Sequence, residues 1–247
     1  MTKGDDMSDT APRLEPLNKI MITSRDFSEY LEMFGLTEND VLAGPVLDCA
    51  AGASDFALRA RGLGASVVSV DPLYDRRPDE LRGRVLDELD IGELRAREAP
   101  QLYDLSWAGG LDGYLGMRRS AATAFLDDYE RAWSGGGPRP YQPAALPDLP
   151  FGEGQFRLGL VPNLLFTYAN LFDRDWHRAA LLELLRVCDE VRVHPLTDTS
   201  GRFYPELDLL LAELAERGAE CQLIDVDYRL RRERSRTLVC RKGQGSV

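Results

Sequence analysis

Two aspartates, each at the end of a short apolar stretch, are the residues of this sequence best placed to do chemistry. Asp48 ends the stretch that begins at Val46, and Asp71 directly follows the stretch of residues 66–70. Between them lie a turn of small residues and a helix that stops at a glycine. A carboxylate at the tip of the second strand of such a unit, about 20 residues after the first strand, can accept hydrogen bonds from ribose hydroxyls. We therefore expect this strand–helix–strand unit to bind a nucleotide.

The turn carries a more specific pattern. The dinucleotide pattern G-x-G-x-x-G is absent from it. Instead, Asp48-x-Ala50-x-Gly52-x-Ser54 resembles the D-x-G-x-G-x-G motif of class I methyltransferases, which depend on S-adenosylmethionine (SAM). Only the central glycine of that motif is kept. The resemblance implies that SAM binds along the turn, and a packing turn without a ligand is the alternative.

The rest of the chain supplies the elements that must position this unit. Two strands predicted near the C-terminus have no helix between them, so they must pair antiparallel. The sequence thus predicts an α/β fold with a Rossmann-like, seven-stranded, mostly parallel sheet and a C-terminal antiparallel hairpin, as in class I methyltransferases. Besides the unit itself, strands are predicted at 139–142, 156–161, 190–195, 221–228 and 237–240, and helices at 24–36 (with Ser24 as N-cap), 173–187 and 206–217.

A long segment separates the second and third predicted strands. Residues 75–138 contain no convincing strand, and their apolar residues recur at helical spacing. We interpret 75–138 as a helical insertion that acts as a lid or substrate wall, with a structural extension or a dimer face as the equal alternative. Residues 1–23 are polar and expected to be disordered, which leaves 24–247 as one SAM-binding, methyltransferase-like domain.

The resemblance also implies roles for individual side chains, each with simple packing as its alternative. Arg25 would meet the cofactor carboxylate, Tyr30 would cover the cofactor, and Gln142 or backbone groups would recognise adenine. Asn163, at the tip of the fourth strand, would face the reacting centre, and Tyr204 follows the fifth strand by a short loop. The implied cofactor-binding residues are Asp48, Ala50, Gly52, Asp71, Pro72, Arg25, Tyr30 and Gln142, and the implied catalytic residues are Asn163, Tyr204 and Tyr168.

Composition limits the classes of partner. A net charge of −11 argues against a nucleic-acid partner. No apolar run is long enough for a membrane-spanning helix. With two histidines and four cysteines without C-x-x-C spacing, we expect no metal site and no disulfide framework. The cysteines favour a reducing cytosol, hence a cytoplasmic protein. We also expect a monomer or a homodimer.

Three functions remain open at this stage. The first is methyl transfer from SAM to a nitrogen or oxygen of a small molecule, as in specialised metabolism. The second is cyclisation of SAM as sole substrate, in which its own amine closes azetidine-2-carboxylic acid and expels methylthioadenosine. The third is a degenerate SAM-binding protein without activity. The first is favoured. Displacement at a carbon of the sulfonium mainly needs alignment, charge complementarity and exclusion of water, and an aromatic face can hold the sulfonium.

Overall fold

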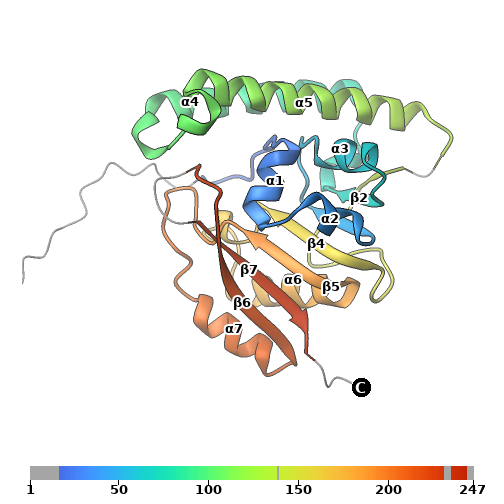
Figure 1. The fold of residues 1–247 in the computed structure, drawn as a ribbon, viewed down its shortest axis with the longest axis vertical. Coiled ribbons are helices and arrows are strands. Elements are labelled where there is room, and N and C mark those ends of the chain that lie inside the picture. Colours follow the sequence, from blue (N-terminus) through green and yellow to red (C-terminus); the bar gives the residue numbers. More distant parts are fainter. Residues whose placement is uncertain (1–16, 138, 231–234, 244–247) are drawn as a thin grey trace, which may run out of the picture.

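The computed structural model describes residues 17–137, 139–230 and 235–243 and shows a sheet between two layers of helices (Figure 1). The strand order is β3-β2-β1-β4-β5-β7-β6. β7 pairs antiparallel with both of its neighbours, and the remaining pairs are parallel. This confirms the predicted α/β fold and its C-terminal hairpin. The strands are β1 Val46–Cys49, β2 Val67–Val70, β3 Tyr141–Gln142, β4 Phe156–Pro162, β5 Cys188–His194, β6 Ala219–Val226 and β7 Ser235–Lys242.

The helices are divided between the two faces of the sheet. α1 and α3 lie on one face beneath the long pair α4 and α5, and α6 and α7 lie on the other (Figure 1). Short 3-10 turns connect several elements, including 72–75, 106–108 and 166–168. The α-helices are α1 Phe27–Phe34, α2 Glu38–Leu42, α3 Phe56–Gly62, α4 Pro78–Glu98, α5 Leu111–Ser134, α6 Arg174–Val187 and α7 Leu207–Ala215.

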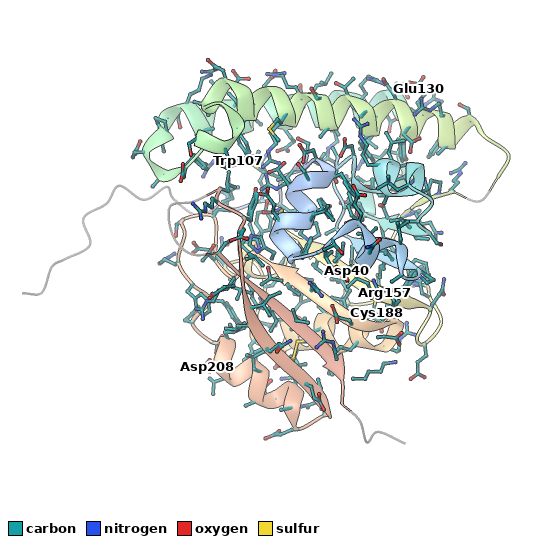
Figure 2. All side chains as sticks on the ribbon, viewed as in Figure 1. Asp40, Trp107, Glu130, Arg157, Cys188 and Asp208 are labelled. Carbon is teal, nitrogen blue, oxygen red and sulfur yellow. A yellow bond between two sulfur atoms is a disulfide. The ribbon has the colours of Figure 1, made fainter. Side chains whose placement is uncertain are left out.

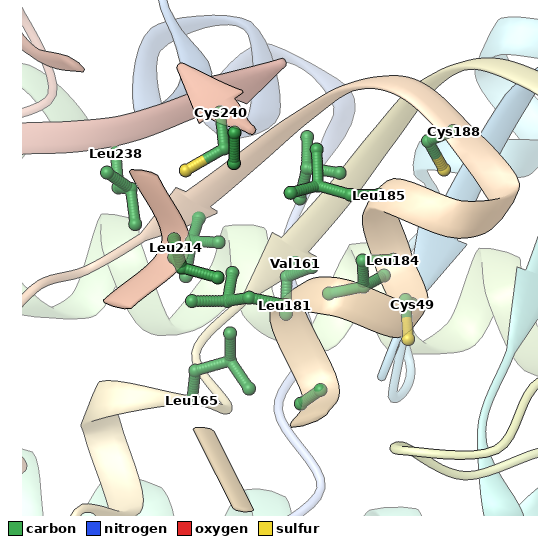
Figure 3. Packing of buried hydrophobic residues seen from close by; sticks show 14 of the residues in the cluster. Cys49, Val161, Leu165, Leu181, Leu184, Leu185, Cys188, Leu214, Leu238 and Cys240 are labelled. Atoms are coloured by element: carbon green, nitrogen blue, oxygen red, sulfur yellow. The ribbon is translucent and has the colours of Figure 1, made fainter. Parts of the chain in front are cut away.

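The alternation of side chains along the strands creates two hydrophobic cores. In β1, Val46 joins the core beneath α1 and α3, whereas its neighbour Leu47 joins the core beneath α6 and α7. Figure 3 shows the second core, where Leu181 and Leu184 of α6 pack near Val161 of β4. Burial on both faces explains why the parallel strands are almost continuously apolar in sequence.

The start of α1 differs from the prediction. Asp26, not Ser24, is the N-cap, because its carboxylate accepts the N–H of Glu29 while the Glu29 side chain accepts the N–H of Asp26. This reciprocal capping box is a stronger helix start than a lone serine. Ser24 is therefore not part of the helix cap and lies buried in the segment that precedes the helix.

The prediction that the cysteines form no disulfide was also wrong. Cys221 and Cys240 lie directly opposite one another in the β6–β7 pair and form a disulfide. Their spacing of 19 residues carried no recognisable motif, because only the register of the hairpin brings them together. The expectation of a reducing cytosol rested on unpaired cysteines and loses that support.

The 75–138 insertion is built mainly from α4 and α5, which pack side by side and are tied by ion pairs. Arg119 of α5, for example, bonds both Asp90 and Glu93 of α4. Residues 1–23 were expected to be disordered. Residues 1–16 lie outside the described part of the chain, whereas residues 17–23 have a defined place, and Ile22 is buried. None of the helices that the structure describes is long and apolar enough to cross a membrane.

The core beneath α6 makes a direct stability prediction. Leu184 is fully buried there, so Leu184→Ala should lower the free energy of unfolding by about 2–5 kcal/mol, measured by urea denaturation. Leu209→Ala on α7, where the leucine is 57% exposed, is the matched control and should change it by less than about 1 kcal/mol. Equal effects of the two substitutions would contradict the packing described here.

Candidate functional site

A cavity of about 430 Å³ lies where β4 and β5 end, beneath the α4–α5 pair. Its walls come from the segment of residues 17–26 before α1, from α4 and α5, and from the loops that follow β4, β5 and β6. Ligands of open α/β sheets bind at the carboxyl ends of the strands, and the volume is that of a small-molecule site. The 75–138 insertion therefore borders the cavity, as a lid or substrate wall would.

A buried charged network forms one side of the cavity. Arg25, which is 5% exposed, pairs with Glu29 at 3.5 Å and donates to the Tyr114 hydroxyl at 3.0 Å. Its second terminal nitrogen donates to Asn163 Oδ1 at 3.2 Å. Tyr228 donates to Glu29 at 2.8 Å. Burial raises the pKa of Glu29, although Arg25 and the Tyr228 hydrogen bond act in the opposite direction.

Aromatic side chains cover this network. Trp107 lies in the connection between α4 and α5 (Figure 2). Its ring contacts those of both Tyr114 and Tyr228. The charged pair is thus kept from water on the side of the insertion. A buried ion pair is stable only with such additional hydrogen bonds, so the network holds five separate elements in fixed relation.

Several residues that line the cavity carry a buried polar atom that has no hydrogen-bond partner among the described residues. Buried polar groups are hydrogen-bonded in the great majority of cases, and an unpaired one costs on the order of 1–3 kcal/mol. A group of such atoms around one cavity points to a polar ligand. They are Ser24 Oγ, Arg25 Nε, Glu88 Oε2, Asn163 Nδ2 and Thr167 Oγ1.

The turn after β1 lies beside the cavity and is held by residues 23–25. Thr23 O accepts the N–H of Ala53, and Arg25 O accepts the N–H of Asp55. Ala50 and Gly52 both have positive φ, 62° and 59°. A Cβ on Gly52 would lie 2.6 Å from Thr23 O, so this position requires glycine for space as well as for conformation.

Asp71 lies against this turn in a position that suits a ribose. Its two carboxylate oxygens accept the N–H groups of Gly52, at 3.2 Å, and of Leu73, at 3.0 Å. A carboxylate oxygen can accept two hydrogen bonds, so Asp71 keeps acceptor capacity for ligand hydroxyls. Burial is the main reason that its pKa is raised, and the two backbone bonds oppose that shift. The residues present therefore fit the nucleoside end of SAM.

Asp48 and Tyr30 are both buried. Asp48 is 1% exposed and accepts hydrogen bonds from Tyr30 and Ser69, each at 3.1 Å. Tyr30 is fully buried and stacks on Phe56, where α1 packs on α3. Both side chains support the packing beside the turn, and their implied contacts with the cofactor stay predictions.

The other predicted site residues divide into two groups. Asn163 and Tyr168 line the cavity, and the Tyr168 hydroxyl accepts the N–H of Met21 at 2.9 Å. Tyr204 does not reach it: its ring packs on Phe166 and His177 in the core beneath α6. The reason is alternation, because the Thr197–Phe203 bridge directs Phe203 to the cavity and its neighbour Tyr204 to the core.

Neither Pro72 nor Gln142 is among the described residues that line the cavity. Pro72 is exposed at the start of a 3-10 turn. Gln142 is half-buried in β3, and its carbonyl accepts the N–H of Asp71 at 3.3 Å. Their implied contacts with the cofactor stay predictions.

Sequence reasoning missed four residues of this site: Glu88, Tyr114, His194 and Tyr228. His194 could have been found from its place at the end of β5, next to the tip of β4. Glu88 and Tyr114 come from the insertion and Tyr228 from an irregular loop, where the sequence offers no such indication. Burial lowers the pKa of His194 to about 3, so its ring is neutral at pH 7. The Thr237 hydroxyl donates to Met33 O, hence it accepts from His194 Nδ1. Nε2 is left as an acceptor.

Comparison with known proteins was made by sequence and by structure. No family model matches the chain. An uncharacterized protein of Methanocaldococcus jannaschii is 26% identical over 227 residues, which are 92% of this chain and 98% of that protein. Among solved structures, the magnesium protoporphyrin IX methyltransferase of Synechocystis, with bound SAM, has a TM-score of 0.44 at 11% identity, over 88% of this chain and 91% of that one.

The bifunctional kinase-methyltransferase WbdD gives a TM-score of 0.44 at 13% identity over 90% of this chain. The chain spans only 38% of the length of WbdD. These likenesses are distant, and the description of the fold rests on the strand order of the sheet itself.

The environment of Asp48 makes a pH prediction. Burial raises its pKa to about 7, with the Tyr30 and Ser69 hydrogen bonds opposing the shift, whereas an unfolded aspartate titrates near about 4. Between these values the folded protein keeps a proton that the unfolded chain releases. The contribution of Asp48 to stability should therefore fall as pH rises through this window, by at most about 1.4 kcal/mol per unit.

Asp48→Asn does not titrate at this position, so the variant should gain stability relative to the unaltered protein from about pH 4 to about pH 7. Urea denaturation at several pH values measures the difference. The exposed Asp75→Asn is the control for removal of a negative charge. A difference between Asp48→Asn and the unaltered protein that did not change with pH would contradict a protonated, buried Asp48.

Proposed function

We propose that this protein is a SAM-dependent transferase that acts on a nitrogen or oxygen of a small molecule. The observation that carries the proposal is a single juxtaposition. The positive-φ turn at Ala50 and Gly52 lies against the Asp71 carboxylate, and residues 23–25 connect that turn directly to the cavity at the tip of β4. In a sheet of this strand order, those positions correspond to a nucleoside site and to a reacting centre beside it.

The proposed division of roles follows from the positions of the side chains. Asp71 accepts hydrogen bonds from the ribose, and the turn after β1 lies beneath it. When bound, SAM supplies a methyl carbon on a positively charged sulfur; a lone pair of the acceptor forms the new bond, the sulfur keeps the electrons of the broken one, and the acceptor's proton is lost to solvent when the products leave. The α4–α5 pair excludes bulk water from this step.

Asn163 is the residue proposed to orient the acceptor. It follows β4 with a φ of 49°, and its Oδ1 is fixed by Arg25. The amide adds no charge beside a cation. Holding two reactants in line accounts for about 7–11 kcal/mol of barrier lowering without any general base, and this matters here because His194, with a pKa of about 3, is a weak base.

Asp71 makes the nucleotide part of the proposal testable. Each hydrogen bond to a charged acceptor contributes about 1.5–3 kcal/mol, so Asp71→Asn should weaken the binding of S-adenosylhomocysteine by about tenfold or more in calorimetric titration. Asp79→Asn, a carboxylate that is 70% exposed at the start of α4, is the matched control and should bind as the unaltered protein does. Equal affinity of all three proteins would remove Asp71 from the site.

The reaction itself is tested by incubating the protein with SAM alone and with pools of small amines and alcohols, and by identifying the nucleoside product. S-adenosylhomocysteine formed only with an acceptor supports methyl transfer. Methylthioadenosine formed without an acceptor would instead show the intramolecular cyclisation. Failure to bind SAM or S-adenosylhomocysteine at millimolar concentration would contradict the proposed function.

A further inference from the structure

The charge of the cavity differs in sign from the charge of the protein. The described residues that line it include five arginines and only three acidic residues, whereas the whole chain has a net charge of −11. Arg25 is paired with Glu29 and Arg119 with Asp90 and Glu93, and the remaining surplus of arginines in the lining favours a ligand with an anionic group. The charged lining residues are Arg25, Arg95, Arg118, Arg119 and Arg236, with Glu88, Glu93 and Asp198.

Two residues of the lining carry buried donors without a partner among the described residues, which favours an anion as the ligand. Asn163 must turn its amide oxygen toward Arg25, because a guanidinium only donates, and this leaves Asn163 Nδ2 as a buried donor without a partner. Arg25 Nε is a second such donor, since the terminal nitrogens of Arg25 are already bonded to Glu29, Tyr114 and Asn163. A carboxylate accepts from several donors at once and matches this pair.

An unpartnered acceptor lies on the helical side of the same cavity. Glu88 of α4 is 8% exposed. Its Oε1 accepts from Lys19 at 3.1 Å, but its Oε2 has no partner in the part of the chain that the structure describes. A buried carboxylate oxygen is costly unless a donor meets it, and an ammonium group has three N–H donors for that purpose.

We propose that the cavity binds a free α-amino acid, with its carboxylate at Arg25 and Asn163 and its ammonium group at Glu88. Among the described residues, the lining includes neither Asp71 nor the turn residues 50–55, so the cavity is separate from the place that fits the nucleoside. The amino acid is then the second substrate of the transferase, and the methyl group goes to an oxygen of its carboxylate or to a nitrogen or oxygen of its side chain, because the ammonium group at Glu88 has no lone pair. That last step rests on the proposed function, whereas binding of the amino acid does not.

The first test uses the unaltered protein. Ligand-observed NMR with the twenty common L-amino acids, with and without saturating S-adenosylhomocysteine, should identify at least one that binds in both conditions. Calorimetry should then show that the analogue of this amino acid without its amine, and the analogue without its carboxylate, each bind about tenfold more weakly or worse, because each leaves one buried charged group unmatched.

Variants locate the binding to the cavity. Glu88→Gln should weaken binding of the amino acid by about tenfold or more and leave binding of its des-amino analogue unchanged. Glu80→Gln, an exposed position on the same helix and outside the lining, is the matched control. Asn163→Asp places a carboxylate beside the carboxylate of the ligand. This variant should therefore weaken the binding of the amino acid and of its des-amino analogue by the same factor.

The possible failures are distinct. If the protein binds S-adenosylhomocysteine but no amino acid, this inference is overturned and the proposed function stands. If S-adenosylhomocysteine displaces the amino acid, the cavity holds the cofactor's own aminoacyl end, and a second amino-acid substrate is excluded. If an amino acid binds as described but S-adenosylhomocysteine does not bind at all, the amino-acid site stands and the proposed function fails.

Discussion

The buried ion pair between Arg25 and Glu29 is the interaction on which the site depends. It joins the 17–26 segment and α1 to Tyr114 of α5, to Asn163 at the tip of β4 and to Tyr228 after β6. Removing one partner of such a pair leaves an uncompensated buried charge, which costs about 3–5 kcal/mol. The pair is therefore weak evidence for high stability but strong evidence for a fixed geometry around the cavity.

Residues 23–25 also connect the two halves of the site. Their carbonyl oxygens bond the turn after β1, while the side chains of Ser24 and Arg25 line the cavity. A ligand that shifts the turn must therefore move the wall of the cavity, and a ligand in the cavity fixes the segment against the turn. The required glycine at position 52, beneath Thr23 O, shows how closely the segment and the turn approach.

Much of the fold followed from the sequence, because apolar strands and amphipathic helices have local patterns. The hairpin of β6 and β7 was predictable from the missing helix between them, and Asn163 was predictable as a strand-tip residue. Contacts set by packing were not. The place of Tyr204 could not be predicted without the alternation of side chains in the loop after β5. The pairing of Cys221 with Cys240 depends on the register of the hairpin, and the place of Glu88 depends on the position of α4 over the sheet.

The most direct test of the central claim is the structure of the protein crystallised with S-adenosylhomocysteine. The account predicts electron density for the ribose within hydrogen-bonding distance of the Asp71 carboxylate, with the sulfur directed toward Asn163 at the mouth of the cavity. A nucleoside bound away from Asp71, or a sulfur that faces away from the tip of β4 with Asn163 out of reach, would contradict it.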